Sequence, residues 1–348
     1  MKRAFNIFKQ SIDEIKNHLE FDENYKTLLK NVNTQGNTVV DEASAFLKAN
    51  YSKEKIFDYR ANIISLYGAF EQFIEEVIRD YITELSTLVS TFQELNSSIT
   101  SSYLGRWKDL SGKLTWAKFS HISEQGLVTN LFDTIVNNRP NICPDCFLQN
   151  GGNYRHDVIK EMMKSLGFNN YDSQLPLFDP LRTLLDSKGL LNSEMKFMTL
   201  DDLVDRRNEI AHGTITLNIL SNESCLDIVY YIECYAEAVS LFLNDELNEI
   251  KWNQLSGSIC QPDSYVRGGY VVSFTASYAH LSVGKSIVLK CPIGHYPKYL
   301  ETNIESIHAD TPKGATVSKS DLNLDGEETV FSLGLSSSIN THYSFKFD

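Results

Sequence analysis

The sequence has no long apolar run, and its 348 residues include only six cysteines. No uninterrupted apolar stretch approaches the roughly 18 residues that a membrane-spanning helix needs. The beginning of the chain, "MKRAFNIFKQSIDEIKNHLEFDENY", carries charged residues too often to form the apolar centre of a signal peptide. The cysteines are too few and too scattered for a disulfide framework and fit a reducing compartment. We therefore expect a soluble, cytoplasmic protein without a membrane partner.

Positive charge is also scarce, since 32 Lys and Arg stand against 45 Asp and Glu, a formal net charge of -13. This balance argues against broad, sequence-independent binding to a phosphate backbone, which depends on clustered Lys and Arg. It leaves open an enzyme that acts on nucleic acid through a local basic cleft. Residues 256–348 contain 7 Lys/Arg and 9 Asp/Glu, so the acidic excess lies mainly in residues 1–255.

Hydrophobic periodicity predicts that residues 1–255 form a helical domain. A long helix is expected over residues 54–92, because apolar side chains recur there at three-to-four spacing. This stripe consists of Ile63, Tyr67, Phe70, Ile74, Val77, Tyr81 and Leu85. A second long helix is predicted over residues 226–250, "LDIVYYIECYAEAVSLFLNDELNEI", with shorter helices between the two.

Composition changes after residue 255. The segments that follow are rich in β-branched and aromatic residues and are separated by Gly, Pro, Asn and Asp: "YVVSFTASY", "KSIVLKC", "ETVFSLGLS" and "HYSFKF". Such segments are typical of short strands joined by turns. The sequence therefore predicts a mainly α protein with a helical domain over residues 1–255 and a small antiparallel β-domain, a sandwich or a barrel, over residues 256–348.

One predicted helix carries an arginine on its apolar face. The stretch is "DDLVDRRNEIAHGTITL", residues 201–217. At about 100° per residue, its apolar face is defined by Leu200, Leu203, Val204, Ile210 and Ala211. Arg207 projects from the middle of this face, whereas Arg206 points to the opposite side. Because burying a guanidinium is costly without a partner, Arg207 is a candidate functional residue.

Two further polar residues border the same face, Asn208 and His212. Gly213 follows, which predicts that His212 lies in the last helical turn, with Asn208 one turn before it. A purely structural alternative remains open for Arg207 and for His212. Arg207 could pack its aliphatic stem on apolar neighbours, and His212 could simply cap the helix.

The segment "RRNEIAHG" resembles the signature of the HEPN (higher eukaryotes and prokaryotes nucleotide-binding) superfamily. That signature is an arginine followed by a small polar residue and then a histidine, with four to six residues between the arginine and the histidine. Arg207, Asn208 and His212 match it, with four residues between. The likeness is greatest to the MAE-type and RiboL-PSP-HEPN group. "ISLYGAFEQFIEEVI" resembles an early helix of that group with an internal glutamate, here Glu71, and "GGNYRHDVIKEMMKSLGF" resembles its central segment. The resemblance spans roughly residues 55–250.

This resemblance implies a HEPN-type helical bundle and a metal-independent endoribonuclease whose site is assembled by a homodimer. Its implied substrate is RNA, it needs no cofactor, and its role is that of a toxin or phage-defence effector, with an antitoxin or regulatory protein as a partner. Chemically, arginine can clamp a phosphate bidentately and histidine can transfer protons near neutral pH. Glu71 could hold Arg207 or His212, or could be a solvated flanking residue. The alternative function is a catalytically silent HEPN binding or regulatory module.

One position departs from the antitoxins of the superfamily that pair with nucleotidyltransferases. In those proteins a tyrosine two residues after the histidine can be modified, and here that position is Thr214. The substitution argues against that regulatory scheme.

Two other segments carry weaker signals. The run "YLGRWKDLSGKLTWAKF", residues 103–119, is a candidate RNA-binding patch through Arg106, Lys108 and Lys113, or alternatively a surface turn between helices. "CPDC" and "CPIGH" have the spacing of half zinc sites. A complete site would need two distant loops to meet, so we expect ordinary loop cysteines and no bound metal.

Overall fold

A computed structural model describes residues 1–31, 38–148, 153–213, 218–310, 315–339 and 343–347. Its internal contacts divide the chain into two compact units, Met1–Ser240 and Leu241–Asp348. The division falls within the last helix, α9 (Asn222–Gln254), whereas the domain boundary expected from composition falls just after that helix ends.

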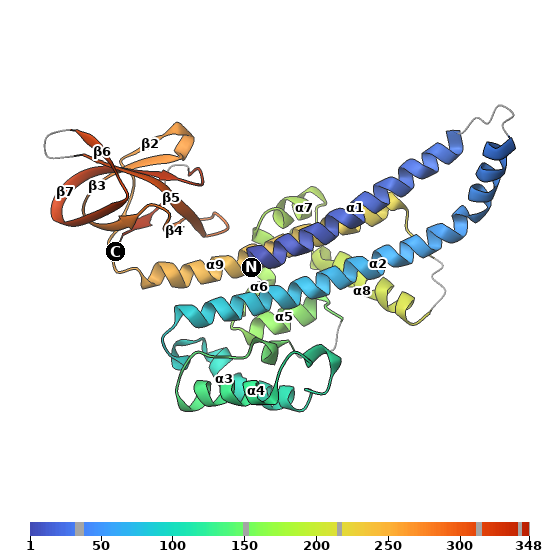
Figure 1. The fold of residues 1–348 in the computed structure, drawn as a ribbon, viewed down its shortest axis with the longest axis horizontal. Helices are drawn as coiled ribbons and strands as arrows, with labels where there is room; N and C mark the ends of the chain where they lie inside the picture. Colours follow the sequence, from blue (N-terminus) through green and yellow to red (C-terminus); the bar gives the residue numbers. More distant parts are fainter. Residues whose placement is uncertain (32–37, 149–152, 214–217, 311–314, 340–342, 348) are drawn as a thin grey trace. The chain divides into compact units, whose positions relative to one another are not determined.

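The helical unit is organised by a hairpin of two long helices, α1 (Lys2–Asn31) and α2 (Thr38–Leu88), which run side by side in Figure 1. They are antiparallel, since the N-terminal ammonium group pairs with Asp80 at 2.9 Å and His18 lies 3.8 Å from Asp58. Apolar residues at helical spacing close the interface, where the rings of Phe8 and Phe73 lie 5.1 Å apart. The long apolar stripe predicted for α2 is buried, with Phe70 fully enclosed.

Shorter helices pack around this hairpin. They are α3 (Ser97–Ser111), α4 (Glu124–Leu131), α5 (His156–Ser165), α6 (Tyr171–Gln174), α7 (Leu181–Ser187) and α8 (Met198–Ala211). Single turns of other helix types link them: η1 (Phe92–Glu94), η2 (Ala117–Phe119), η3 (Phe132–Val136), η4 (Pro144–Phe147), η5 (Leu175–Leu177) and η6 (Glu194–Phe197). Polar side chains cap the N-terminal ends of two of these helices, α3 and α4. The side chain of Asn96 accepts a hydrogen bond from the Ser98 amide, and that of Ser123 accepts one from the Gly126 amide.

The second unit is an antiparallel sheet structure preceded by the end of α9. Its strands are β1 (Ile259–Cys260), β2 (Ser264–Val266), β3 (Val271–Ser282), β4 (Ser286–Lys290), β5 (Tyr299–Asp310), β6 (Thr316–Lys319), β7 (Asp321–Leu335) and β8 (Phe345–Lys346), with a short turn, η7 (Arg267–Gly269), before β3. The larger sheet has the order β2-β3-β7-β5-β4, with β6 paired to β5, and β1 pairs with β8.

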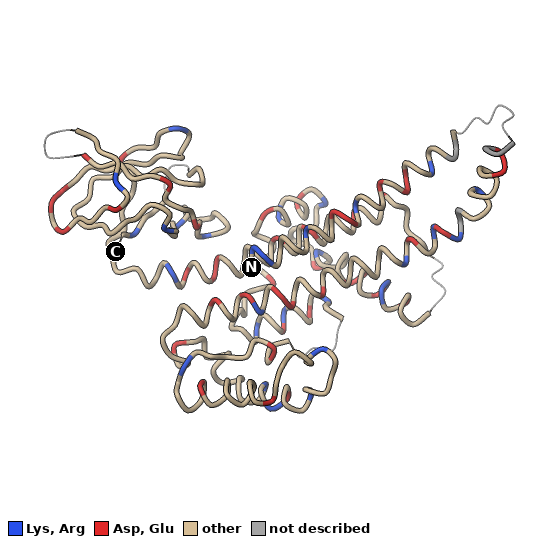
Figure 2. Tube along the Cα trace, in the orientation of Figure 1, with Lys and Arg blue, Asp and Glu red and all other residues tan. Residues whose placement is uncertain are grey.

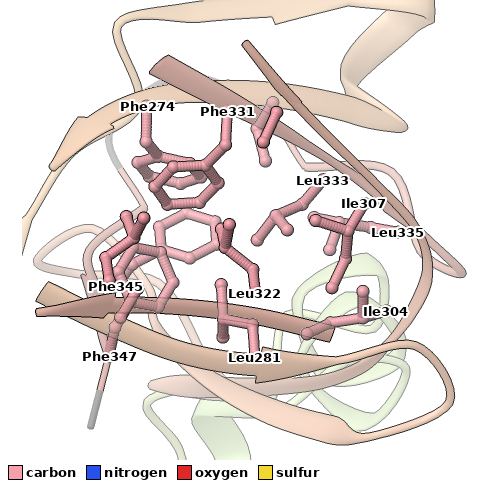
Figure 3. Packing of buried hydrophobic residues seen from close by; sticks show 14 of the residues in the cluster. Phe274, Leu281, Ile304, Ile307, Leu322, Phe331, Leu333, Leu335, Phe345 and Phe347 are labelled. Carbon is pink, nitrogen blue, oxygen red and sulfur yellow. The ribbon is translucent and has the colours of Figure 1, made fainter. Parts of the chain in front are cut away.

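Phenylalanine, leucine and isoleucine side chains fill the core of this unit (Figure 3). Phe274 of β3 contacts Phe345 at 4.7 Å and Phe347 at 5.1 Å between ring centroids, and it lies 5.5 Å from Phe331 of β7. Buried and exposed residues alternate along residues 307–310 of β5 and residues 321–325 of β7, as strand periodicity requires. The predicted fold class, mainly α with a small C-terminal antiparallel β region, is confirmed.

The last turns of α9 belong to the β-unit and bring acidic residues against β5. Asp245 accepts a hydrogen bond of 2.8 Å from the Tyr299 amide, and Glu246 lies 3.8 Å from Lys298. Burial raises the pKa of Asp245 to about 6 and that of Glu246 to about 7. Among the described helices, none is both long and apolar enough to span a membrane.

Candidate functional site

Arg207 of α8 lies against α2. Its guanidinium carbon is 4.8 Å from the centroid of the Tyr67 ring, and its Nη1 donates a hydrogen bond of 3.0 Å to Oδ1 of Asn208. The side chain is half-buried. A cation over an aromatic face is stabilised without being neutralised, so the guanidinium keeps its charge at the packed side of α8.

Tyr67 and Glu71 stand one turn apart on α2 and share the face that meets Arg207. Tyr67 is buried, and its hydroxyl oxygen accepts hydrogen bonds from the backbone amides of Asn153 (2.7 Å) and Tyr154 (3.0 Å), which fix the ring. Glu71 is half-buried. Burial is the main cause that raises its pKa, Glu75 adds to the shift, and the positive charge of Arg207 opposes it.

His212 ends α8 and is exposed. Its backbone amide donates a hydrogen bond of 3.0 Å to the carbonyl of Asn208, and Gly213 follows with a φ of +70°, as predicted for a helix C-terminus. His212 lies five positions after Arg207, about 7.5 Å along the helix axis. Within the described part of the chain, no hydrogen bond joins the imidazole to another residue. In one chain, therefore, Arg207 is close enough to Glu71 to counteract the rise that burial causes in the pKa of that carboxyl, whereas His212 is exposed to solvent.

Two expectations for α8 are wrong. Ile210 and Ala211 were predicted to be buried, but Ile210 is only half-buried and Ala211 is exposed. The buried residues of α8 are Leu200, Leu203 and Val204, so the packed face ends before the last turn. The helical wheel assumes that a neighbour covers the whole length of the helix, whereas the last turn of α8 is left largely open.

Arg206, predicted to point to the side of α8 opposite the apolar face, is held there by polar contacts. Its Nε donates to Asp202 at 2.7 Å, and its Nη1 donates to the Tyr59 hydroxyl at 3.0 Å and to the Asn218 carbonyl at 3.2 Å. The side chain is 14% exposed. Tyr59 precedes Tyr67 by about two turns on α2, so α2 contacts both neighbouring arginines at different points along its length.

Residues that sequence reasoning missed hold α8 in place from α5. Arg155 forms a two-pronged ion pair with Asp205, and the amide of His156 donates to Asp201 at 3.2 Å. The His156 ring is buried, between the Tyr235 hydroxyl at 3.0 Å and Asp172 at 2.6 Å. Burial lowers its pKa, against the opposing effect of Asp172. Arg155 and His156 lie within the segment that resembles the central part of the family, and their partners Asp201, Asp205 and Tyr235 are at least 45 positions away in the sequence.

The face of α2 continues into a second set of polar contacts. Glu75 pairs with Lys118 at 2.5 Å and accepts a hydrogen bond of 2.7 Å from the Tyr154 hydroxyl. Arg79, one turn further, donates to Asp145 at 3.0 Å. Lys118 comes from the basic and aromatic run identified in the sequence, so this part of the run contacts α2 next to Glu71.

The three candidate RNA-binding residues do not share one face. Arg106 is half-buried, with its guanidinium carbon 5.1 Å from the Phe147 ring centroid, and burial lowers its pKa. Lys108 is exposed and projects about 200° away from Arg106 around α3. The Lys113 ammonium lies 5.5 Å from the Trp116 ring centroid. Figure 2 shows basic and acidic residues interspersed along the helices.

Among the residues described, no group of three or more His, Cys, Asp or Glu is arranged to hold a metal ion. Cys143 and Cys146 lie in the helical unit, while Cys291 and His295 belong to the β-unit. Thr214 lies outside the described residues.

Comparison with known protein families assigns most of the chain to one family. The RiboL-PSP-HEPN family model matches residues 23–245, which is more than half of the sequence and includes Glu71, Arg207, Asn208 and His212. No curated protein matches the chain. The match begins in α1 and ends in α9, and it leaves the strands outside. The chain therefore belongs to the RiboL-PSP-HEPN family.

Proposed function

We propose that the protein is a metal-independent endoribonuclease that acts through Arg207, Asn208 and His212 at the interface of a homodimer. The observation that carries the proposal is the environment of Arg207. Its charge is retained over Tyr67 and beside Asn208, at the edge of an open helical turn that ends in an exposed His212. Among the described residues no carboxylate lies within ion-pair distance of Arg207, so its positive charge is available to a phosphate.

The chemistry requires three functions. The 2′-hydroxyl of RNA attacks the adjacent phosphorus, so the new bond joins O2′ to phosphorus and the bond from phosphorus to O5′ breaks. A base accepts the 2′-hydroxyl proton, an acid donates a proton to O5′, and a cation stabilises the charge on the phosphorane. His212 is suited to proton transfer and Arg207 to two-pronged contact with phosphate oxygens. The products are a 2′,3′-cyclic phosphate and a 5′-hydroxyl.

The acid and the base call for two histidines, and the motif supplies one per chain. In the proposed dimer, His212 of each copy serves one of these functions. The last turn of α8 supports this arrangement, because Ala211 is exposed and Ile210 half-exposed beside His212, and apolar groups in such positions favour burial against a second protein surface. Asn208 holds the Arg207 guanidinium, and Glu71 orients it through its charge.

Purified protein incubated with RNA in EDTA tests the proposal. We expect cleavage by the wild type and loss of cleavage by at least a hundredfold for Arg207→Ala and His212→Ala, following the size of typical acid–base contributions. Glu209→Gln is the matched control, since Glu209 is exposed on the same helix and should leave cleavage unchanged. Circular dichroism establishes that each variant is folded.

Intact RNA with the wild type, or cleavage that survives both substitutions, would contradict the proposal and favour a silent binding module. A protein that is strictly monomeric while it cleaves RNA would contradict the shared site. For the biological role, we propose a toxin or phage-defence effector restrained by a partner protein. Expression of the wild type, but not of His212→Ala, should then arrest bacterial growth.

A further inference from the structure

The segment "CPDC" places two thiols in direct contact. Cys143 precedes the turn η4 and Cys146 lies within it, and a hydrogen bond joins the two side chains. The turn is fixed from α3, because the Tyr103 hydroxyl oxygen accepts a hydrogen bond of 3.0 Å from the Cys143 amide. All six cysteines are free thiols.

The surroundings make the two thiols unequal. The Cys146 thiol and the backbone amides of Asp145 and Cys146 lower the pKa of Cys143, against the opposing effect of burial. The pKa of Cys146 is strongly raised, by its hydrogen bond to Cys143 and by burial. Cys143 is 8% exposed and Cys146 is fully buried. A thiol at the start of a helical turn, with a second, more deeply buried thiol one turn later, is an arrangement that permits thiol–disulfide exchange between the two.

The pair differs from the other buried cysteines of the helical unit. Cys225 and Cys234 on α9 are 4% and 1% exposed, and burial raises the pKa of each to about 11. Neither has a second cysteine within its own turn, so they behave as apolar side chains. A metal site is not supported at Cys143 and Cys146, since no third ligand joins them among the residues that the structure describes.

We propose that Cys143 and Cys146 form a redox-active dithiol that is oxidised reversibly by small-molecule disulfides. The Cys143 thiolate attacks one sulfur of the small disulfide, forms a mixed disulfide and releases one small thiol. The Cys146 thiol then loses its proton to solvent and attacks the Cys143 sulfur. This closes the Cys143–Cys146 disulfide and releases the second small thiol. The protein dithiol loses two electrons and two protons, and the small disulfide gains them.

Equilibration of the whole protein with glutathione and its disulfide tests the inference. Samples at several ratios are quenched with acid, alkylated with N-ethylmaleimide after denaturation, and analysed by intact and peptide mass spectrometry. We expect two of the six thiols to be lost together, a Cys143–Cys146 disulfide in the peptides, and full recovery of both thiols with dithiothreitol. Protein that keeps all six thiols at every ratio would overturn the proposal.

Single substitutions separate the two roles. Cys146→Ser should accumulate a stable glutathione adduct on Cys143, whereas Cys143→Ser should leave Cys146 unmodified. Cys225 and Cys234 report on unfolding within the same sample. Modification of all four buried thiols at one common rate, or no adduct on Cys146→Ser, would show that the pair is inert core. None of these outcomes depends on RNA cleavage.

Discussion

Replacing Tyr67 by phenylalanine isolates the contact that fixes the ring beneath Arg207. The change keeps the aromatic face but removes the oxygen that accepts the amides of Asn153 and Tyr154. Asn153 is exposed, so water can replace its lost partner, whereas Tyr154 is fully buried. One unsatisfied buried amide costs about 1–3 kcal/mol. For a domain of this size, the melting temperature should fall by roughly 2–10 °C.

Denaturant unfolding followed by circular dichroism measures this loss. Tyr25→Phe is the control, because the Tyr25 hydroxyl has no hydrogen-bond partner within the described ranges, and it should leave stability unchanged. RNA cleavage should largely survive Tyr67→Phe. Tyr67→Leu should reduce cleavage, since it removes a cation–π contact with Arg207 worth about 0.5–2 kcal/mol. A Tyr67→Phe variant as stable as the wild type would refute the reasoning.

Three further changes test other parts of the structure. Burial raises the pKa of Glu246 to about 7 in the folded protein. The unfolded chain gives up the same proton at a lower pH, near the usual value of about 4.5. The stability contributed by the neutral carboxyl therefore falls as pH rises from about 4.5 to 7. Glu246→Gln should therefore stabilise the protein at pH 8 by roughly 3 kcal/mol in denaturant unfolding. Arg206→Met should destabilise it by about 1–3 kcal/mol through lost contacts with Tyr59, without abolishing cleavage. Gly167→Ala should lower stability by about 1–3 kcal/mol in the same assay, because Gly167 has a φ of +103°.

Each of these three predictions can be contradicted by a specific result. A Glu246→Gln variant less stable than the wild type at pH 8 would mean that the pairing with Lys298 outweighs the burial of the carboxylate. Loss of RNA cleavage in folded Arg206→Met would assign the chemistry to the wrong arginine. Unchanged stability of Gly167→Ala would show that the backbone there is not constrained.

Sequence periodicity predicted the middle of α2 well and its beginning poorly. The stripe from Ile63 to Leu85 is visible because that part of α2 packs on several neighbours and needs a wide apolar face. The helix begins at Thr38 rather than near residue 54, and Phe46 in this first part is exposed, as is Phe57 just after it. A helix that packs mainly against one neighbour needs few buried side chains, so its sequence carries a weak periodic signal.

The candidate site was likewise predicted only in part from the sequence. Helix geometry on α8 was sufficient to predict that Arg207 faces a packed neighbour and that His212 ends the helix, since both depend on local spacing. The roles of Tyr67 and Arg155 were not predictable, because their contacts with α8 join residues 140 and 50 positions apart in the chain. The contacts of Arg206 with Tyr59 were missed for the same reason.

The chemistry of the product ends tests the central claim most directly. RNA is dephosphorylated, cleaved in EDTA, and labelled with polynucleotide kinase without further phosphatase treatment. The account predicts fragments that accept label at a 5′-hydroxyl and carry a 2′,3′-cyclic phosphate, and no cleavage where the attacking 2′-hydroxyl is replaced by hydrogen. Fragments with 5′-phosphates, cleavage of the 2′-deoxy position, or activity that EDTA abolishes and Mg²⁺ restores would contradict it.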